Sequence, residues 1–213
     1  MRPVKVSFAA FGSYRRETVI DFRELGEQSF FLIHGATGAG KTTVLDAICF
    51  ALYGDASGGT REVRMLRNEE AGASEATWVE LEFLLGEQHY LLFRSPEQVL
   101  QKKRGEGTTK KPAEAVLYIF DGEEKKVLAS RYSAVTEKIE LLLGFKSSQF
   151  RQVVLLPQGE FLRLLLAKSN ERQEIMEVLF NTEIYRLVEE GLKKKARALE
   201  DGHAAVQQRC ELL

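Results

Sequence analysis

Residues 35–42 read GATGAGKT and satisfy the pattern G-x-x-x-x-G-K-[ST]. The apolar run FFLI at residues 30–33 precedes this stretch, and an apolar stripe at helical spacing over residues 41–53 follows it, ended by Gly54. A buried strand, a glycine-rich loop and a helix in this order are the context that identifies a phosphate-binding loop. The stretch therefore predicts an α/β protein that binds the phosphates of a nucleotide.

The residue types in this loop have distinct chemical roles. The glycines allow backbone amides to wrap the phosphates, and the start of the helix adds a favourable partial charge. The Lys41 ammonium can reach the β- and γ-phosphate oxygens, and the Thr42 hydroxyl can ligate Mg²⁺. We therefore predict that ATP and Mg²⁺ bind here and that Lys41 takes part in catalysis. The predicted nucleotide-binding residues are Gly35, Ala36, Thr37, Gly38, Ala39, Gly40, Lys41, Thr42 and Thr43.

The composition is that of an ordinary globular chain. Of its 213 residues, 44% are hydrophobic and 29% are charged, which suits one folded domain with an appendage. Its 30 basic and 31 acidic residues give a net charge of −1, so nucleic-acid binding would need a local patch. Cys49 and Cys210 have no metal-ligand spacing and are expected to be buried thiols in a reducing cytoplasm. No signal peptide or membrane span is expected, because every apolar stretch is short.

Alternating apolar residues predict β-structure on both sides of the loop. Residues 4–8 and 19–22 form one predicted hairpin, and residues 78–130 form three or four predicted antiparallel strands. The segment LYIFD at residues 117–121 imitates the Walker B carboxylate of a P-loop ATPase, but Asp121-Gly122 predicts a hairpin turn. The chain thus carries the phosphate-binding part of an ATPase site without a convincing second carboxylate.

Helical patterns occupy the C-terminal third. Ser133 is a candidate cap for a helix that ends at Gly144, and Asn170 with Gln173 resembles a capping box. Further on, apolar or small residues recur at alternating spacings of four and three, which predicts a coiled-coil seam. The seam residues are Leu192, Ala196, Leu199, His203, Val206, Cys210 and Leu213. Because the seam reaches the last residue without a cap, we expect the chain to be part of a longer polypeptide.

Five segments of the chain point together to one family. They are GATGAGKTT at residues 35–43, LDAI at 45–48, ALYG at 51–54, LLPQGEF at 155–161 and TEIY at 182–185. Their combination resembles the bacterial SbcC family, the SMC-like ATPases of the SbcCD nuclease. The resemblance implies an α/β P-loop NTPase of ATP-binding-cassette type, with the N-terminal lobe of its head over residues 1–168. Residues 169–213 would be helices that lead into a truncated antiparallel coiled coil.

The resemblance also implies partners. In this family a long coiled coil separates such a half from a C-terminal half that carries the signature, Walker B and switch histidine. The other implied partners are a second head in a homodimer, an SbcD-type nuclease subunit and double-stranded DNA. The implied function is an ATPase head that dimerises on ATP and regulates a nuclease in double-strand end and hairpin processing. ATP hydrolysis is then expected only with the C-terminal lobe.

A glutamine completes the site implied by the resemblance. Gln158 corresponds to the Q-loop glutamine, which in such heads approaches Mg²⁺ and the attacking water, so it is a predicted catalytic and metal-site residue. Gln152 is the competing candidate, but only Gln158 follows the apolar run as the family pattern requires.

Several arginines and lysines have open interpretations. Residues 102–104 (KKR) and 110–111 (KK) bracket a loop whose only acid is Glu106, and this basic tip suits either duplex phosphate contacts or a solvated hairpin. Leu66-Arg67 resembles an arginine-bearing loop of SMC heads, although a surface arginine is the favoured interpretation. In the turn FGSY at residues 11–14, other family members often carry arginine, which leaves a base or phosphate contact there open.

Two other function classes compete with this interpretation. The chain could belong to an SMC-type ATPase that tethers chromosomes without a nuclease. It could also be a self-contained P-loop kinase that acts on a small molecule. The heptad seam argues against the kinase, and the LLPQGEF and TEIY segments favour the SbcC family.

Overall fold

The computed structural model describes residues 1–26, 28, 31–55, 66–102, 106–122, 124–153 and 183–211. The chain divides into two compact units, Met1–Pro157 and Gln158–Leu213. The domain boundary predicted after residue 168 falls outside the described residues and stays a prediction.

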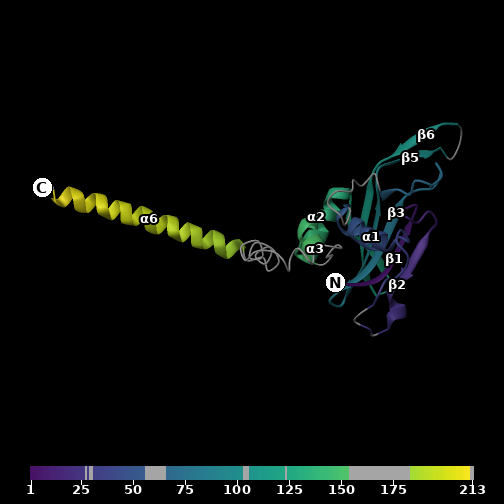
Figure 1. Cartoon of the computed structure of the whole chain (residues 1–213), viewed down its shortest axis with the longest axis horizontal. Coiled ribbons are helices and arrows are strands. Elements are labelled where there is room, and N and C mark those ends of the chain that lie inside the picture. Colours follow the sequence, from purple (N-terminus) through teal and green to yellow (C-terminus); the bar gives the residue numbers. More distant parts are fainter. Residues whose placement is uncertain are drawn as a thin grey trace. The chain divides into compact units, whose positions relative to one another are not determined.

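One antiparallel sheet organises the first unit, with the strand order β2-β1-β3-β4-β7-β8 (Figure 1). Its strands are β1 (Arg2–Ala9), β2 (Thr18–Asp21), β3 (Trp78–Leu85), β4 (Gln88–Ser95), β7 (Glu114–Asp121) and β8 (Glu124–Ser130). The predicted first hairpin and the predicted antiparallel strands are therefore confirmed. The turn at Asp121-Gly122 also forms, since Asp121 pairs with Glu124 and Gly122 has φ +63°, a region that favours glycine.

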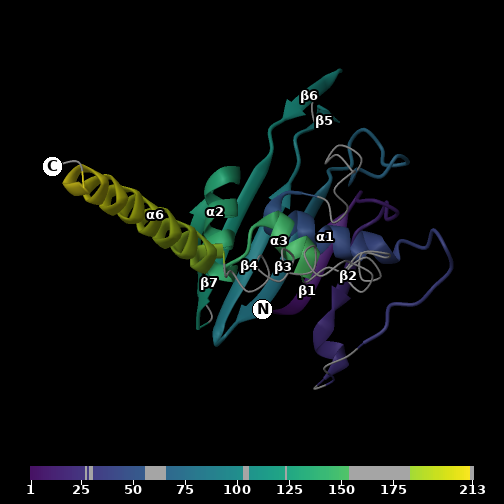
Figure 2. The same cartoon turned by 60° about the vertical axis from the view of Figure 1, so that its left-hand side comes forward.

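Helix α1 (Lys41–Tyr53) packs on one face of this sheet and contacts β1, β3 and β4 (Figure 2). The alternation along β3 explains the packing, because Val79, Leu81 and Phe83 share one face and are fully buried. The helix begins at Lys41 and ends before Gly54, whose φ of +72° gives a left-handed cap. Both bounds agree with the sequence prediction, and the first turn of the helix carries the last three residues of the predicted nucleotide site, Lys41 to Thr43.

A buried arginine fixes the other end of α1. Arg94 on β4 is fully buried, and its guanidinium donates to Ala51 O at 2.8 Å and Leu52 O at 3.2 Å. Its other partners are the Thr136 hydroxyl at 3.2 Å and the Tyr132 ring, whose centroid lies 4.4 Å from Cζ. Burial lowers the pKa of Arg94, yet a guanidinium stays charged. The C-terminus of α1 is therefore attached to the sheet by a cation that satisfies its last carbonyls.

The predicted buried strand before the loop is wrong. Residues 31–36 form no strand, and the side chains of Phe31 and Leu32 are 52% and 82% exposed. A strand of a parallel sheet needs hydrogen-bonded neighbours. In the part of the chain that the structure describes, every pairing is antiparallel and joins other segments.

A short ribbon leaves the sheet between β4 and β7. Its strands are β5 (Gln98–Gln101) and β6 (Thr108–Lys111), which pair with each other and form a separate two-stranded sheet. In Figures 1 and 2 this ribbon projects beyond the end of the six-stranded sheet. The sequences QVLQ and TTKK of these strands carry no apolar–polar alternation, which is why the two strands were not predicted.

Two helices follow β8. Helix α2 (Tyr132–Leu143) begins one residue before Ser133, which is not its cap; the cap residue is Arg131, with φ +80°. The earlier start allows the Tyr132 hydroxyl to donate to Gly54 O at 3.1 Å. Helix α3 (Ser147–Val153), which no sequence pattern had indicated, is held to the end of α1 because Arg151 pairs with Asp55 at 2.9 Å.

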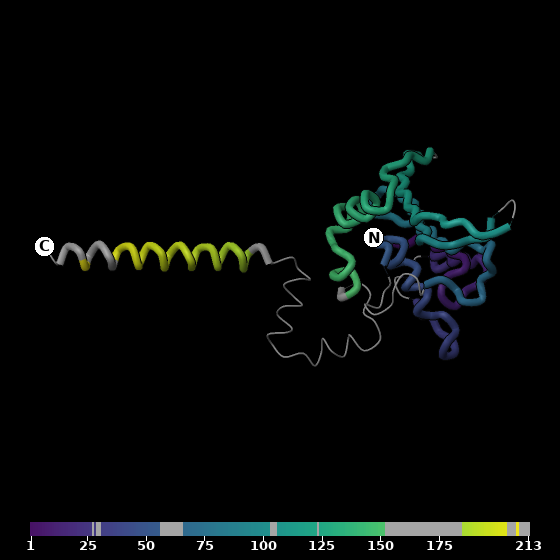
Figure 3. Tube along the Cα trace, turned by 90° about the horizontal axis from the view of Figure 1, so that it is seen from above, coloured from purple at the N-terminus to yellow at the C-terminus, as the bar shows by residue number. Residues whose placement is uncertain are grey.

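The second unit contains helix α6 (Glu183–Glu211), a single continuous helix (Figure 3). Leu192 and Leu199 of the predicted seam are 63% and 75% exposed. Ion pairs at helical spacing line the same helix, with Arg186–Glu190 at 2.9 Å and Lys193–Glu189 at 2.6 Å. No helix in the described ranges has both the length and the apolar composition needed to cross a bilayer.

Candidate nucleotide site

The loop at residues 35–42 is preshaped around its lysine. Lys41 Nζ donates to Gly35 O at 2.9 Å and to Ala36 O at 2.8 Å, so the side chain folds back over the loop. Residues 34–39 are exposed, and Gly38 and Gly40 both have φ +86°. Glycine adopts this backbone conformation without strain. The arrangement brings a cation and the start of a helix to one open surface.

The start of α1 is suited to binding an anion. No acidic residue lies in its first turn, and Gly40 at the N-cap supplies no side-chain acceptor for the free amides. Thr42 is exposed there, whereas Thr43 is buried. An anion at this position would receive backbone hydrogen bonds and the favourable end of the helix dipole. The geometry therefore suits phosphate groups, and the Thr42 hydroxyl is accessible to a Mg²⁺ ion that they carry.

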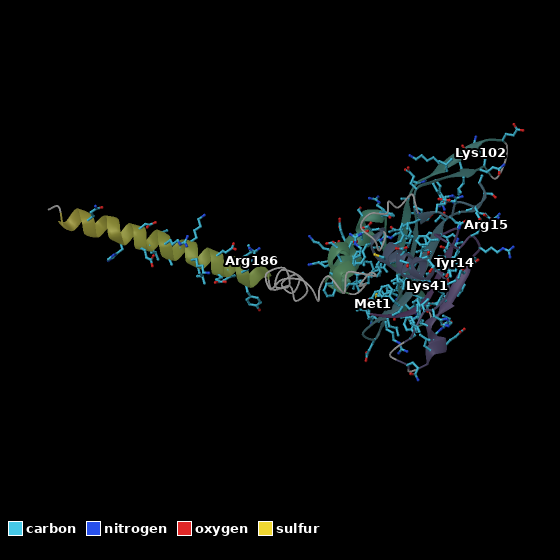
Figure 4. All side chains as sticks on the ribbon, in the orientation of Figure 1. Met1, Tyr14, Arg15, Lys41, Lys102 and Arg186 are labelled. Carbon is cyan, nitrogen blue, oxygen red and sulfur yellow. The ribbon has the colours of Figure 1, made fainter. Side chains whose placement is uncertain are left out.

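A second turn supports the loop from behind. A Cβ built on Gly40 would lie 2.6 Å from Tyr14 Cε2, and one built on Gly12 would overlap the Thr43 side chain. Residues 11–14 therefore touch both the last loop glycine and the first turn of α1. Figure 4 shows Tyr14 and Lys41 in the same part of the first unit. The sequence indicated this turn as part of the first hairpin and for its missing arginine, but its contact with the phosphate loop was not predicted.

Arg67 is a structural residue, and its interpretation as a surface arginine is wrong. Its side chain is half-buried, and Nη1 donates to Glu75 O at 2.8 Å and to the Thr77 hydroxyl at 2.9 Å. Nη2 donates to Gly72 O at 3.0 Å. These acceptors lie on one loop, which curls around the guanidinium.

The basic tip is less positive than the sequence indicated. Lys110 pairs with Glu97 at 2.9 Å and Lys111 pairs with Glu114 at 3.5 Å, so the tip has acidic neighbours besides Glu106. Glu97 comes close because β5 pairs with β6, whereas Glu114 is only three residues from Lys111 in the sequence. Lys102 lies on the projecting ribbon (Figure 4). Lys103 and Arg104 lie outside the described residues.

The predicted glutamine cannot be placed in this site. Gln158 lies outside the described residues, and the structure gives only the helical backbone of Gln152, in α3. Asp121, the Walker B imitation, sits at the β7–β8 hairpin and pairs with Lys126. The described residues contain no group of three or more His, Cys, Asp or Glu side chains that could hold a metal. Within this part of the chain, Thr42 remains the candidate Mg²⁺ ligand.

Cys49 takes no part in this site. It is fully buried in α1, and burial raises the pKa of its thiol to about 12, so the thiolate is not available as a nucleophile. The predicted buried thiol is confirmed for Cys49, while the side chain of Cys210 lies outside the described part.

Comparison with known proteins relates this chain to the AAA domain family and to SbcC subunits of the nuclease SbcCD. A family model described as an AAA domain matches residues 5–211. The chain is 42% identical over 199 residues to the SbcC subunit of the nuclease SbcCD from Vibrio cholerae, covering 93% of this chain and 20% of that protein. The proteins of the same name from Lactococcus lactis and Staphylococcus saprophyticus are 38% and 34% identical, over 92% and 94% of this chain. The chain spans about a fifth of the length of these relatives.

Proposed function

Because the chain belongs to the AAA domain family, we propose that it binds ATP with Mg²⁺ and forms part of the ATPase head of an SbcCD-type nuclease. The single observation that carries the proposal is the shaped loop at residues 35–42, in which Lys41 is held over an open helix start. The SbcC-named relatives support the nuclease complex over a chromosome tether or a small-molecule kinase.

The loop and the helix start would hold the triphosphate. Backbone amides of residues 36–42 bind its oxygens, Lys41 neutralises the β- and γ-phosphates, and Thr42 holds Mg²⁺. Mg²⁺ supplies charge neutralisation at the transferring phosphoryl group. We assign the orientation of the attacking water to Gln158, which the described residues do not include.

The rest of the polypeptide would complete the head. The exposed apolar side chains of Phe31, Leu32 and Ile33 lead directly into the loop, and such a segment is stabilised by pairing with strands. We propose that a C-terminal half of the same polypeptide supplies the strands that pair with this segment, together with the second carboxylate of the ATPase site. A second head, an SbcD-type nuclease subunit, duplex DNA at the basic tip and a cytoplasmic location complete the proposal.

Helix α6 supports a coiled-coil root. Its seam residues Leu192 and Leu199 are exposed, while its polar positions carry ion pairs along the helix. An apolar stripe of this kind is buried when a second helix packs along it. We propose that a second helix of the same polypeptide packs antiparallel along α6 and forms a coiled coil with it.

Calorimetry and turnover measurements test the proposal. The 213-residue chain should bind MgATP weakly and hydrolyse it negligibly, and addition of the C-terminal half should restore turnover. Lys41→Ala should reduce ATP binding sharply while the fold survives, because the phosphates lose their cation. Lys146→Ala, at an exposed lysine elsewhere on the same unit, is the matched control. Robust turnover by the chain alone would instead support a self-contained kinase.

A further inference from the structure

The turn behind the phosphate loop is joined to the segment that follows α1. Gly12 N donates to Leu66 O at 2.6 Å, and Asn68 Nδ2 donates back to Gly12 O at 2.7 Å. Asn68 N also donates to Ala10 O at 3.0 Å. A displacement of this turn therefore has to displace residues 66–68 as well, because three hydrogen bonds would otherwise break.

Arg67 connects that segment to the base of the β5–β6 ribbon. Besides its bonds within the loop, Arg67 Nη1 lies 3.3 Å from the side-chain oxygen of Gln98, the first residue of β5. The same oxygen accepts from Thr77 N at 2.8 Å. The Gln98 amide nitrogen donates to Thr77 O at 3.0 Å and to Ser95 Oγ at 2.8 Å. Thr77, Ser95 and Gln98 are buried, so their network is shielded from water, which strengthens its hydrogen bonds and makes a partly broken network costly.

Within the described residues, the ribbon does not extend the main sheet by strand pairing. Its two strands pair with each other and form a separate sheet. An open cavity of about 550 Å³ separates the ribbon base, at Pro96, Val99 and Ala113, from Gly54 and Tyr132 of the body. Within the described residues, the ribbon is tied to the body by the hydrogen bonds around Gln98 and by Gln101 N, which donates to Ala73 O at 2.7 Å. Ala73 lies in the loop whose carbonyls hold the Arg67 guanidinium, so both attachments involve Arg67.

We propose that Arg67 is a positioning residue through which nucleotide at the phosphate loop changes the order of the β5–β6 ribbon. The inference rests on the proposed function for its nucleotide. Phosphate binding fixes the backbone at Gly40, against which Tyr14 packs, and the turn transmits that restraint through residues 66–68 to Arg67 and Gln98. A ribbon that carries the basic tip would then present its cations differently with and without nucleotide.

Hydrogen–deuterium exchange of the 213-residue chain tests this coupling without DNA. Saturating MgATP should slow amide exchange in peptides covering residues 98–111 by about fivefold, the lower end of usual coupling between sites. Arg67→Lys keeps the charge but cannot reproduce the planar set of hydrogen bonds, so it should abolish this response. Arg23→Lys makes the same change at an exposed guanidinium that pairs with Asp21, and it should leave the response intact.

Calorimetry on the same samples separates the possible failures. If MgATP binds and ribbon exchange in the native chain does not change, the coupling is refuted while nucleotide binding stands. A response that survives in Arg67→Lys would overturn the assignment to Arg67. If calorimetry detects no binding of MgATP to the chain, the proposed function fails, and the coupling fails with it. Exchange measurements on the native chain with and without MgATP therefore test the coupling between the phosphate loop and the ribbon, even if Arg67→Lys does not fold.

Discussion

Replacing Gly40 by alanine should destabilise the first unit through two separable effects. Gly40 has φ +86° and ψ +14°, a left-handed conformation that costs an alanine about 1–2 kcal/mol. The added Cβ would lie 2.6 Å from Tyr14 Cε2 and 3.1 Å from Ser13 Cβ. Carbon atoms prefer roughly 3.5–4 Å, so neighbouring groups must shift, and such overpacking costs about 1–3 kcal/mol. The free energy of unfolding should therefore fall by about 2–5 kcal/mol.

Gly38 provides a matched control for the steric part. It has the same φ of +86°, but a Cβ there would meet nothing within 4 Å, so Gly38→Ala should show only the backbone cost. In a Tyr14→Ala background, Gly40→Ala should lose most of its steric cost, which a double-mutant cycle measures. Urea unfolding followed by fluorescence of Trp78, the single tryptophan, reports on the sheet without a contribution from α6.

Two results would refute this reasoning. One is a Gly40→Ala variant no less stable than Gly38→Ala, since the Tyr14 contact would then carry no energy. The other is a cost of Gly40→Ala that is the same with and without the Tyr14 ring. Either result would mean that residues 11–14 do not support the phosphate loop.

Three further predictions concern catalysis, DNA and pH. With the C-terminal half present, Gln158→Ala should reduce ATP turnover more than ATP binding, because a water-positioning amide acts in the reacting state. If only Gln152→Ala gave this phenotype, the water-positioning role would belong to Gln152. Alanine at residues 102–104 should weaken binding to unrelated DNA duplexes about equally. It should also flatten the slope of log affinity against log salt concentration by about one unit per lost phosphate contact. If the slope equals that of the native chain, the basic tip is a solvated hairpin without phosphate contacts. Hydrogen bonds from Arg23 lower the pKa of Asp21 to about 2. The stabilisation from this carboxylate should therefore be present above pH 4 and lost as the pH falls toward 2. The urea midpoint of Asp21→Asn should then lie below that of the native chain at pH 5 and equal it near pH 2.

Local sequence signals predicted the elements that depend on local chemistry. The helix from Lys41 to Tyr53 follows from the glycines on either side and from apolar spacing. The Asp121-Gly122 turn follows from the backbone freedom of glycine, and it correctly removed a false Walker B residue. The start of α1 directly after residues 35–40 also agrees with the sequence, while the role of residues 35–42 in nucleotide binding stays a prediction.

Features that depend on distant partners could not be predicted. Residues 31–33 have the composition of a buried strand, yet no described strand pairs with them. Arg67 looked like a surface residue because its acceptors at Gly72 and Glu75 are backbone carbonyls, which carry no sequence signature. The pairing of Lys110 with Glu97 likewise arises only when β5 and β6 come together.

The attachment of α1 by Arg94 depends on the side chain at position 94 but not on the side chains of the helix residues it contacts. Its acceptors on the helix are the main-chain oxygens of residues 51 and 52, which persist whatever side chains stand there. Sequence drift along the end of the helix can therefore leave the attachment untouched, within the limits of packing. Substitution at position 94 would break the attachment. Lysine lacks the planar set of donors, and an apolar residue would leave the carbonyls of residues 51 and 52 without this partner. A survey of tolerated substitutions should find that position 94 accepts only arginine, while positions 51 and 52 accept residues that still pack in the core.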